Sequence, residues 1–346
     1  RTSIFLPSVV VGTAMSARFI FLNNMTWTFA EIWNQSLLER EERELVARDV
    51  IWASELGKAK VDIWLKMKGE RPTNPPNARS LRKFEAGNIF EWIIKLILLR
   101  AGILKESQKW VPYQYEGLLE VTGKLDFIAG GTPDYEKAKA DLDALSLPDV
   151  FLRAGRNILN HFQVNYPNGL DDKVLEIKST GAYLFDLYEA NKASSRNHRL
   201  QIFHYLKAEN IPLGDIVYIC RDDCRMLEIP ILNPSAVEDD YRKEIEEITG
   251  YYNANEQPPL EKPIVFDEDV KKFTKNWQVA YSGYLTKLYG LKDQMEFDDT
   301  YGSIAERWNR VLTRVKEKKE MTSKNNDVLE EIRKAGYNID EIILHL

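Results

Sequence analysis

The segment Val174–Ser179 reads Val-Leu-Glu-Ile-Lys-Ser and constrains the fold more than any other stretch of the chain. Its apolar residues predict a short strand, with Glu176 and Lys178 on one face and Leu175 and Ile177 on the other. Burying two charges on a strand is costly unless they pair or serve a function. The segment therefore predicts either an edge strand with a solvated face or a charged site inside a sheet.

The rest of the chain predicts helices, then a mixed sheet with helices, then helices. Apolar periodicity and capping signals predict helices at 26–50, 55–68 with Ser54 as its cap, 78–100, 150–162, 182–190 and 196–209. Alternating or short apolar runs predict strands at 110–115, 118–129 and 174–179 and a hairpin of 216–220 with 226–231. The remainder is expected to be helical, with breaks at 255–263 and near Asp298. The fold class expected is α/β, with a central mixed sheet flanked by helices.

One predicted helix, 78–100, should bury a broad apolar face. The side chains expected on that face are Phe84, Ile89, Phe90, Ile93, Ile94, Leu96 and Ile97. The same helix carries Glu91 inside its most apolar stretch. A carboxylate in that position needs a partner or a function if it is buried.

Three regions are expected along the chain. Residues 1–50 form an N-terminal extension and a helix, 51–255 form the α/β core with an insertion at 132–170, and 256–346 form a C-terminal helical region. The insertion is either a lid over the site or a tolerated surface insertion. No apolar run reaches the roughly 20 residues that a membrane span needs. The apolar start of the chain, 4–14, is interpreted as an extension or an early strand, and the protein is expected in the cytoplasm.

Composition excludes several classes of protein. The 346 residues contain only two cysteines, Cys220 and Cys224, which excludes a disulfide framework and a metal site of four thiolates. The net charge of −6 argues against polyanion binding by the whole surface but leaves a local basic groove open. No phosphate-binding loop, serine-hydrolase elbow or zinc-protease motif is present.

Further polar residues lie in apolar settings elsewhere in the chain. Asp126 interrupts the predicted strand 118–129, and Gln201 and Tyr205 lie at i and i+4 on one face of a predicted helix. Together with Glu91 and Glu176 they indicate a site for a hard cation, since Mg²⁺ takes a few carboxylates and keeps waters and substrate phosphates.

These motifs resemble those of the PD-(D/E)xK nuclease superfamily. Within it they resemble most specifically the RecB-type branch, which includes phage λ-type exonucleases and CRISPR-adaptation nucleases. The residues that carry this resemblance are Gly87-x-x-x-Glu91, Gly123-x-x-Asp126, Glu176-x-Lys178 and Gln201-x-x-x-Tyr205. Ser54-Glu55-Leu56-Gly57 also resembles the helix opening that precedes the core in this family. The resemblance implies a restriction-endonuclease-like fold for residues 51–255.

The resemblance also implies roles for these residues. Glu91, Asp126, Glu176 and the backbone carbonyl of Ile177 would hold Mg²⁺ or Mn²⁺. Lys178 would orient or deprotonate the attacking water, or neutralise charge in the transition state. Gln201 and Tyr205 would position the metal ligands and the nucleic-acid backbone. The alternative for Lys178 is a structural salt bridge to Glu176.

Many relatives in this branch bind an iron–sulfur cluster through four cysteines. In this chain the matching positions resemble Ala59, Val279, Ser282 and a position near Leu288, none of which provides a thiolate. We therefore expect no iron–sulfur cluster. The alternative is that the aromatic residues from Trp277 to Tyr284 are ordinary core.

The function expected from the resemblance is a Mg²⁺- or Mn²⁺-dependent deoxyribonuclease. An exonuclease acting on single-stranded DNA or duplex ends, in phage or prokaryotic recombination or DNA processing, is the first interpretation. A restriction-type or structure-specific endonuclease and a catalytically idle DNA-binding module of a recombination or CRISPR assembly are the alternatives. A helicase or recombinase partner and a homo-oligomer are also considered. Basic residues near the motifs are candidates for DNA contact, namely Lys58, Lys60, Arg82, Lys83, Arg196 and Arg199.

Overall fold

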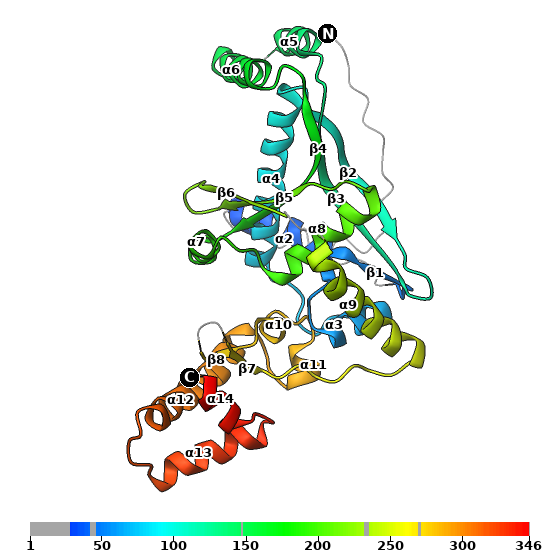
Figure 1. Ribbon diagram of the computed structural model, residues 1–346. Coiled ribbons are helices and arrows are strands. Elements are labelled where there is room, and N and C mark those ends of the chain that lie inside the picture. The colour runs from blue at the N-terminus through cyan, green and yellow to red at the C-terminus, as the bar shows by residue number, and fades with distance from the viewer. Residues whose placement is uncertain (1–27, 42–45, 147, 232–234, 269–270, 346) are drawn as a thin grey trace.

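The structure is a computed structural model, and it describes residues 28–41, 46–146, 148–231, 235–268 and 271–345 (Figure 1). The expectations for residues 1–27 lie outside the described residues. Within them, a six-stranded sheet carries helices on both faces. This arrangement confirms the expected α/β fold with a central mixed sheet.

The sheet mixes parallel and antiparallel neighbours. Its strands are β1 (Val50–Trp52), β2 (Leu104–Tyr113), β3 (Glu120–Gly131), β4 (Leu170–Thr180), β5 (Gly214–Cys220) and β6 (Met226–Pro230). They lie in the order β1-β3-β4-β5-β6, and β2 also pairs with β3. The pairs β1/β3 and β4/β5 are parallel, while β2/β3, β3/β4 and β5/β6 are antiparallel. The predicted strand 174–179 is therefore an interior strand, β4, and the edge-strand alternative is wrong.

Two apolar clusters hold helices against the two faces of this sheet. On one face α8 (Arg196–Glu209) packs on β3, β4 and β5 through side chains such as Leu200 and Ile216, and α9 (Ser235–Ala254) packs on α8. On the other face α4 (Ala78–Arg100) and α6 (Asp149–Asn165) pack through side chains such as Leu98 and Phe127. The sheet is thus the middle layer of three.

The insertion between β3 and β4 contains two helices, α5 (Tyr135–Asp143) and α6. These helices lie at one end of the molecule, beyond the end of the sheet that holds Gly131 (Figure 1). Gly155 of α6 approaches Arg100 at the end of α4 so closely that a Cβ would lie 3.3 Å from its Cδ. The insertion therefore extends the α4 side of the sheet.

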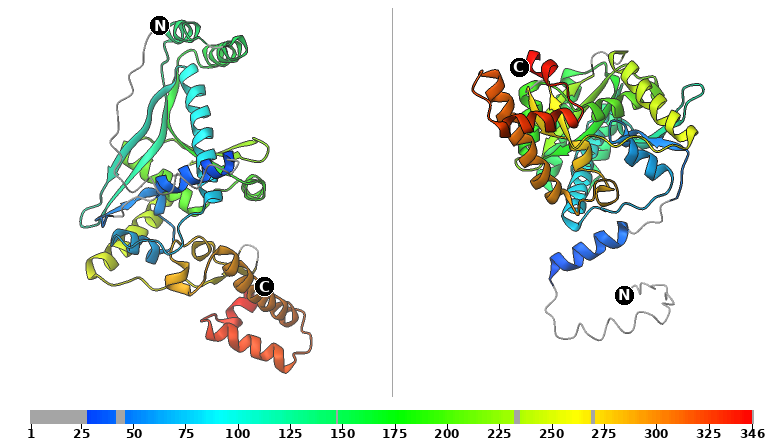
Figure 2. Two further views of the ribbon diagram at one scale, coloured as in Figure 1. Left: turned by 180° about the vertical axis from the view of Figure 1, so that it is seen from behind. Right: turned by 90° about the horizontal axis from the view of Figure 1, so that it is seen from below.

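The C-terminal elements lie at the end of the molecule opposite α5 and α6 (Figure 2). They are β7 (Ile264–Asp267), β8 (Lys272–Lys275), α10 (Trp277–Ala280), α11 (Leu285–Tyr289), α12 (Gln294–Lys316), α13 (Ser323–Lys334) and α14 (Ile339–His345). The sequence interpretation missed the two strands, and the expected break near Asp298 is wrong because α12 passes through it. Phe273 of β8 is buried beside Trp308 of α12, so these strands are stabilised by helices that are distant in the sequence.

The remaining helices correct the expectations for the N-terminal part. They are α2 (Phe29–Glu41), a short 3₁₀ turn η2 (Ala53–Glu55), α3 (Lys60–Met67) and α7 (Ala182–Asn191). Helix α3 begins at Lys60, so the helix expected from residue 55 with Ser54 as its cap is wrong. Gly57 adopts φ +76°, and a Cβ there would lie 3.1 Å from Asn197 of α8. The close approach to α8 therefore bends the chain before α3 can start.

Helix α4 has the predicted bounds, because Asn77 caps it by accepting a hydrogen bond from the backbone amide of Ser80. Its expected broad buried face is wrong: of the seven side chains expected there, only Ile94 is buried. The sheet contacts a narrow strip of the helix, and several large apolar side chains face away from it. No described helix is long and apolar enough to span a membrane.

Candidate active site

The site lies where β3 and β4 separate. Their ladder runs from Gly131 with Leu170 to Phe127 with Leu175, and Asp126 and Glu176 are the next residues on the two strands. The backbone amide of Ile177 donates a hydrogen bond of 2.7 Å to Oδ2 of Asp126. The carboxylate thus continues the connection between the strands beyond the end of the ladder.

The side chains of β3 change faces at Asp126. Val121 and Leu125 belong to the cluster under α8, whereas Phe127 and Ala129 belong to the cluster under α4. A strand with regular alternation would keep all four on one face. The irregularity lets Asp126 approach Glu91, which comes from α4 on the other face of the sheet.

Gln108 of β2 connects these two carboxylates, and the sequence interpretation missed it. Its amide donates to Oε1 of Glu91 and, at 3.5 Å, to Oδ1 of Asp126. Gln108 has a left-handed backbone with φ +54°, which is rare for a residue with a side chain inside a strand. No sequence pattern marks this position, since the constraint comes from its place opposite Asp126 in the β2/β3 ladder.

Lys178 connects the strand to helix α8. Its ammonium lies 2.6 Å from Oε1 of Glu176 and donates a hydrogen bond of 2.9 Å to Oε1 of Gln201. The amide of Gln201 donates at 3.2 Å to the hydroxyl of Tyr205, which donates in turn to the backbone carbonyl of Lys124 on β3. The Gln201-x-x-x-Tyr205 pair therefore links β4 to β3.

The two glycines of the motifs leave room for these contacts. A Cβ on Gly123 would lie 2.9 Å from the hydroxyl of Tyr205, and a Cβ on Gly87 would lie 3.2 Å from Oγ of Ser179. A Cβ atom does not lie within 3.0 Å of another heavy atom, so the absence of one at Gly123 permits the hydroxyl of Tyr205 to reach β3.

Burial raises the pKa of all three carboxyl groups, and repulsion between carboxylates adds to the rise at Asp126 and Glu91. The pKa of Asp126 is raised well above its usual range by burial and by the charges of Glu176 and Glu91, against the opposing effect of Lys178. Burial and then the charge of Glu176 raise the pKa of Glu91. Burial raises the pKa of Glu176, although Lys178 opposes it. Three carboxylates beside one lysine, of which Glu176 is buried and Glu91 and Asp126 are partly buried, leave an excess of negative charge that favours a cation.

The donor set fits a hard cation. One oxygen of Glu176, Oε2, is buried and has no hydrogen-bond partner among the described residues. Within the described ranges, no group of three or more His, Cys, Asp and Glu side chains is already arranged around one point as a metal site. Lys178 and the amide of Gln108 donate to the carboxylates instead. Carboxylate and carbonyl oxygens are the ligands that Mg²⁺ and Mn²⁺ take.

Of the six basic residues expected to contact DNA, four have partners within the chain. Lys60 pairs with Glu244 and Glu247, and Arg196 pairs with Asp240 and Glu244. Arg82 donates a hydrogen bond to Asn34, and Arg199 donates one to the carbonyl of Ser194. Lys83 is exposed. Burial, and then the charge of Lys66, lowers the pKa of Lys58 to about 8, and Lys178 contributes in the same direction. The charge of the site lysine, Lys178, therefore reaches the ammonium of Lys58.

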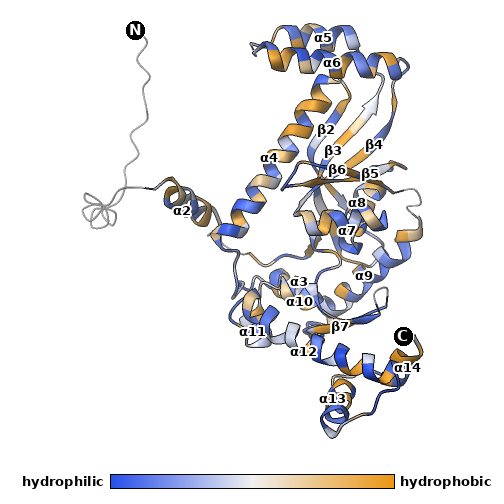
Figure 3. Ribbon diagram, turned by 90° about the vertical axis from the view of Figure 1, so that its left-hand side faces the viewer, coloured by the Kyte–Doolittle hydropathy of each residue, from blue (hydrophilic) through white to orange (hydrophobic). Residues whose placement is uncertain are grey.

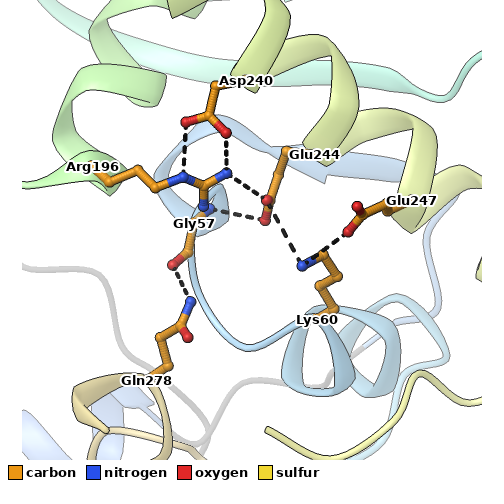
Figure 4. Close-up of polar contacts among 7 residues, drawn as sticks. All are labelled: Gly57, Lys60, Arg196, Asp240, Glu244, Glu247 and Gln278. Atoms are coloured by element: carbon orange, nitrogen blue, oxygen red, sulfur yellow. Dashed lines mark hydrogen bonds and ion pairs between the residues drawn. The ribbon is translucent and has the colours of Figure 1, made fainter. Parts of the chain in front are cut away.

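The ion pairs of Lys60 and Arg196 join the α3 region to α8 and α9 (Figure 4). Arg196 donates to Asp240 at 2.8 and 2.6 Å and to Glu244 at 2.9 Å. Glu244 also accepts from the amide of Gly57, whose carbonyl accepts from Gln278 at 2.8 Å. This network holds the loop before Lys58 against the start of α8.

Apolar and neutral polar contacts occupy the positions that match cluster cysteines in relatives. Ala59 and Leu288 pack in one cluster with Tyr284, and Val279 is buried in the next. Ser282 is buried and donates a hydrogen bond of 2.7 Å to Asp62. These contacts join α3 to the segment 276–289.

Solved structures resemble this chain at low sequence identity. No family model matches the sequence, and no curated protein matches it. The crystal structure of SSO0001 aligns with 12% identity and a TM-score of 0.43, over 76% of this chain and 97% of that chain. The alkaline exonuclease LHK-Exo from Laribacter hongkongensis aligns with 12% identity and a TM-score of 0.36, over 65% of this chain and 93% of that chain. LHK-Exo in complex with dAMP gives a TM-score of 0.37.

Proposed function

We propose that this protein is a metal-dependent deoxyribonuclease that hydrolyses phosphodiester bonds. The observation that supports this most strongly is the convergence of Glu91, Asp126, Glu176 and Lys178 from three elements at the point where β3 and β4 separate. A structural salt bridge alone would need one carboxylate beside Lys178 and not three. Charge in excess of pairing at a buried site is typical of a functional centre.

Glu91, Asp126 and Glu176, with the carbonyl of Ile177, would hold Mg²⁺ or Mn²⁺. A divalent cation bound there would polarise the scissile phosphate and lower the pKa of a bound water. To provide the ligands, Glu91 and Asp126 would give up their contacts with the amide of Gln108. The unpaired oxygen of Glu176 is available without any such exchange.

Lys178 would act next to that water. Its pKa remains high, because the charges of Glu176 and Asp126 outweigh the effect of burial. A charged ammonium can orient the water and stabilise negative charge on the phosphate in the transition state. Oε1 of Gln201 accepts a hydrogen bond from this ammonium and therefore fixes its direction.

Contact with the DNA backbone requires further positive charge. Lys178 lowers the pKa of Lys58, so the two ammonium groups interact, and no described side chain accepts a hydrogen bond from the ammonium of Lys58. We propose Lys58 as a phosphate contact and Lys83 as an outer one. Lys60, Arg82, Arg196 and Arg199 would act there only by giving up contacts within the chain.

We propose an exonuclease acting on single-stranded DNA or duplex ends. The test is digestion of end-labelled linear DNA and of closed circular DNA in Mn²⁺, with Lys178→Ala as the inactive variant. The expected result is loss of linear DNA, intact circles and no activity in the variant. Cutting of closed circles would identify an endonuclease. If the purified wild type cuts neither substrate, the nuclease proposal is wrong, and DNA binding without cutting would identify an idle module.

A further inference from the structure

Helix α4 exposes a stripe of large apolar side chains. The fractional exposures of its members are 56% for Ile89, 63% for Trp92, 47% for Ile93, 45% for Leu96 and 51% for Leu99. The part of α4 that runs toward α6 is accordingly coloured largely as hydrophobic (Figure 3). Five such side chains on one face are far more than the scattered exposed apolar residues of an ordinary surface.

The spacing of these residues puts them on one line along the helix. Positions 89, 92, 93, 96 and 99 follow the i, i+3, i+4, i+7 pattern of a helix that packs against another helix. Glu91 points in a different direction, toward the site. Helix α4 therefore has one face for the sheet and the site, and a second apolar face that is exposed from Ile89 to Leu99, between the contacts of α4 with α2 and with α6.

A charge of opposite sign lies at each end of the stripe. Glu85 is one turn before Ile89 on the same line, and Arg100 is one turn after Leu96. The stripe thus begins with an acid, has an apolar middle and ends with a base. Two copies of it are complementary when they run in opposite directions, because each acid then meets a base. A parallel pair would bring like charges together.

We propose that this face is the contact between two copies of the chain, packed as an antiparallel helix pair about a two-fold axis. With the axis between Trp92 and Ile93, Ile89 lies against Leu96 of the partner subunit. Glu85 lies against Arg100 of the partner subunit at both ends. Such an isologous contact uses the same residues twice, so one short stripe provides a closed dimer.

The contact is independent of the proposed chemistry, since it uses none of the residues that would hold a cation or contact DNA. It would nevertheless hold α4, and so the backbone that carries Glu91, from the side opposite the sheet. Loss of the dimer and loss of nuclease activity can therefore be measured separately.

Cysteine cross-linking tests the register. Cys224 is exposed and Cys220 is buried, so Cys224→Ser serves as the background. In the antiparallel pair, position 89 faces position 96 of the other copy, whereas two copies of position 89 are separated by about 10 Å along the axis. A disulfide requires Cα atoms within about 7 Å.

We expect a disulfide-linked dimer only when the two cysteine variants are mixed. Ile89→Cys alone and Leu96→Cys alone should give no disulfide-linked dimer, while the two variants mixed and oxidised should give one. Cross-linking of each variant with itself would indicate a parallel pair and would overturn the proposed register. No cross-linking in any sample would overturn the contact.

Sedimentation velocity of the full chain over a range of concentrations tests the dimer itself. We expect a concentration-dependent dimer whose dissociation constant rises about tenfold or more in Ile93→Lys, because a charge then lies in the centre of an apolar contact. Met295→Lys, at a side chain 72% exposed on α12, is the matched control and should leave the dimer unchanged. A wild type that is monomeric throughout would overturn the proposal and leave the face to another segment or another protein. A dimer that survives Ile93→Lys would place the contact elsewhere.

Discussion

The backbone amide of Ile177 donates a hydrogen bond of 2.7 Å to Oδ2 of Asp126, across the point where β4 leaves β3. This contact holds a carboxylate at the end of the ladder, where side chains from both faces of the sheet can meet. It also leaves Oδ1 of Asp126 near Gln108, at 3.5 Å. The position of Asp126 is therefore set by the backbone of one neighbouring strand and a side chain of the other.

Replacement of Asp126 should separate activity from stability. Asp126→Asn keeps an oxygen for the amide of Ile177 but removes one of three mutually repelling charges. We expect cleavage in Mn²⁺ to fall by about a hundredfold or more, with a metal-free unfolding free energy equal to or above that of the wild type. Glu106→Gln, at an exposed carboxylate on β2, is the control and should cleave normally. Wild-type activity in Asp126→Asn would exclude this residue as a ligand.

Loss of Lys178 should cost stability as well as activity. Lys178→Ala leaves the buried carboxylate of Glu176 without its partner at 2.6 Å, and removing one member of a buried pair costs about 3–5 kcal/mol. Lys105→Ala breaks a pair of equal length with Asp172, but that pair is exposed and should cost less than about 1 kcal/mol. Urea denaturation measures the loss of unfolding free energy in each of the two variants.

A second substitution tests why Lys178→Ala should lose unfolding free energy. If the unpaired charge is the cause, Glu176→Gln in the Lys178→Ala background should recover part of the lost unfolding free energy while cleavage stays absent. No recovery would mean that packing of the lysine stem, and not its charge, stabilises the site.

The left-handed backbone at Gln108 predicts an unusual preference for glycine inside a strand. Because φ is +54° there, Gln108→Gly should be more stable than Gln108→Ala by about 1 kcal/mol. At neighbouring Ser107, whose backbone is not left-handed, Ser107→Ala should instead be more stable than Ser107→Gly. Chemical denaturation of the four variants provides the comparison. Both changes at Gln108 should also raise the pKa of Glu91 further, since the amide of Gln108 lowers it.

His204 predicts a loss of stability in mild acid. Burial lowers its pKa to about 4, and its ring contacts the hydroxyl of Tyr241 and the carbonyl of Val111, each at 2.8 Å. The unfolded chain has the ordinary pKa of about 6.5 and takes up a proton first, so stability present above pH 6.5 is lost as the pH falls toward 4. The complete loss of unfolding free energy due to His204 is about 3 kcal/mol.

Unfolding free energies measured in urea between pH 7 and pH 4 test this. His204→Gln should show a shallower decrease than the wild type, while His161→Gln, at an exposed histidine of α6, should show the wild-type decrease. Equal slopes in all three proteins would mean that other groups cause the acid sensitivity.

Local sequence patterns were sufficient for the elements whose own residues specify them. The helices at 78–100 and 196–209 have the predicted bounds, since caps and helical periodicity act over a few residues. The strand of Glu176 and Lys178 was predicted from its alternation. The strands β7 and β8 were missed because their stability comes from α12, which follows them in the chain.

The residue types of the candidate site were determined by the sequence alone: charged and amide side chains placed in apolar segments predict a polar cluster, since buried charge must have a partner. Which of them meet was decided by the tertiary structure. Asp126 reaches Glu91 only because β3 changes its facing residues there, and Gln108 joins them through an unusual backbone. The exposed stripe of α4 was likewise hidden from the sequence. Periodicity shows that a helix has an apolar face, but only the packing shows how much of that face the sheet can cover.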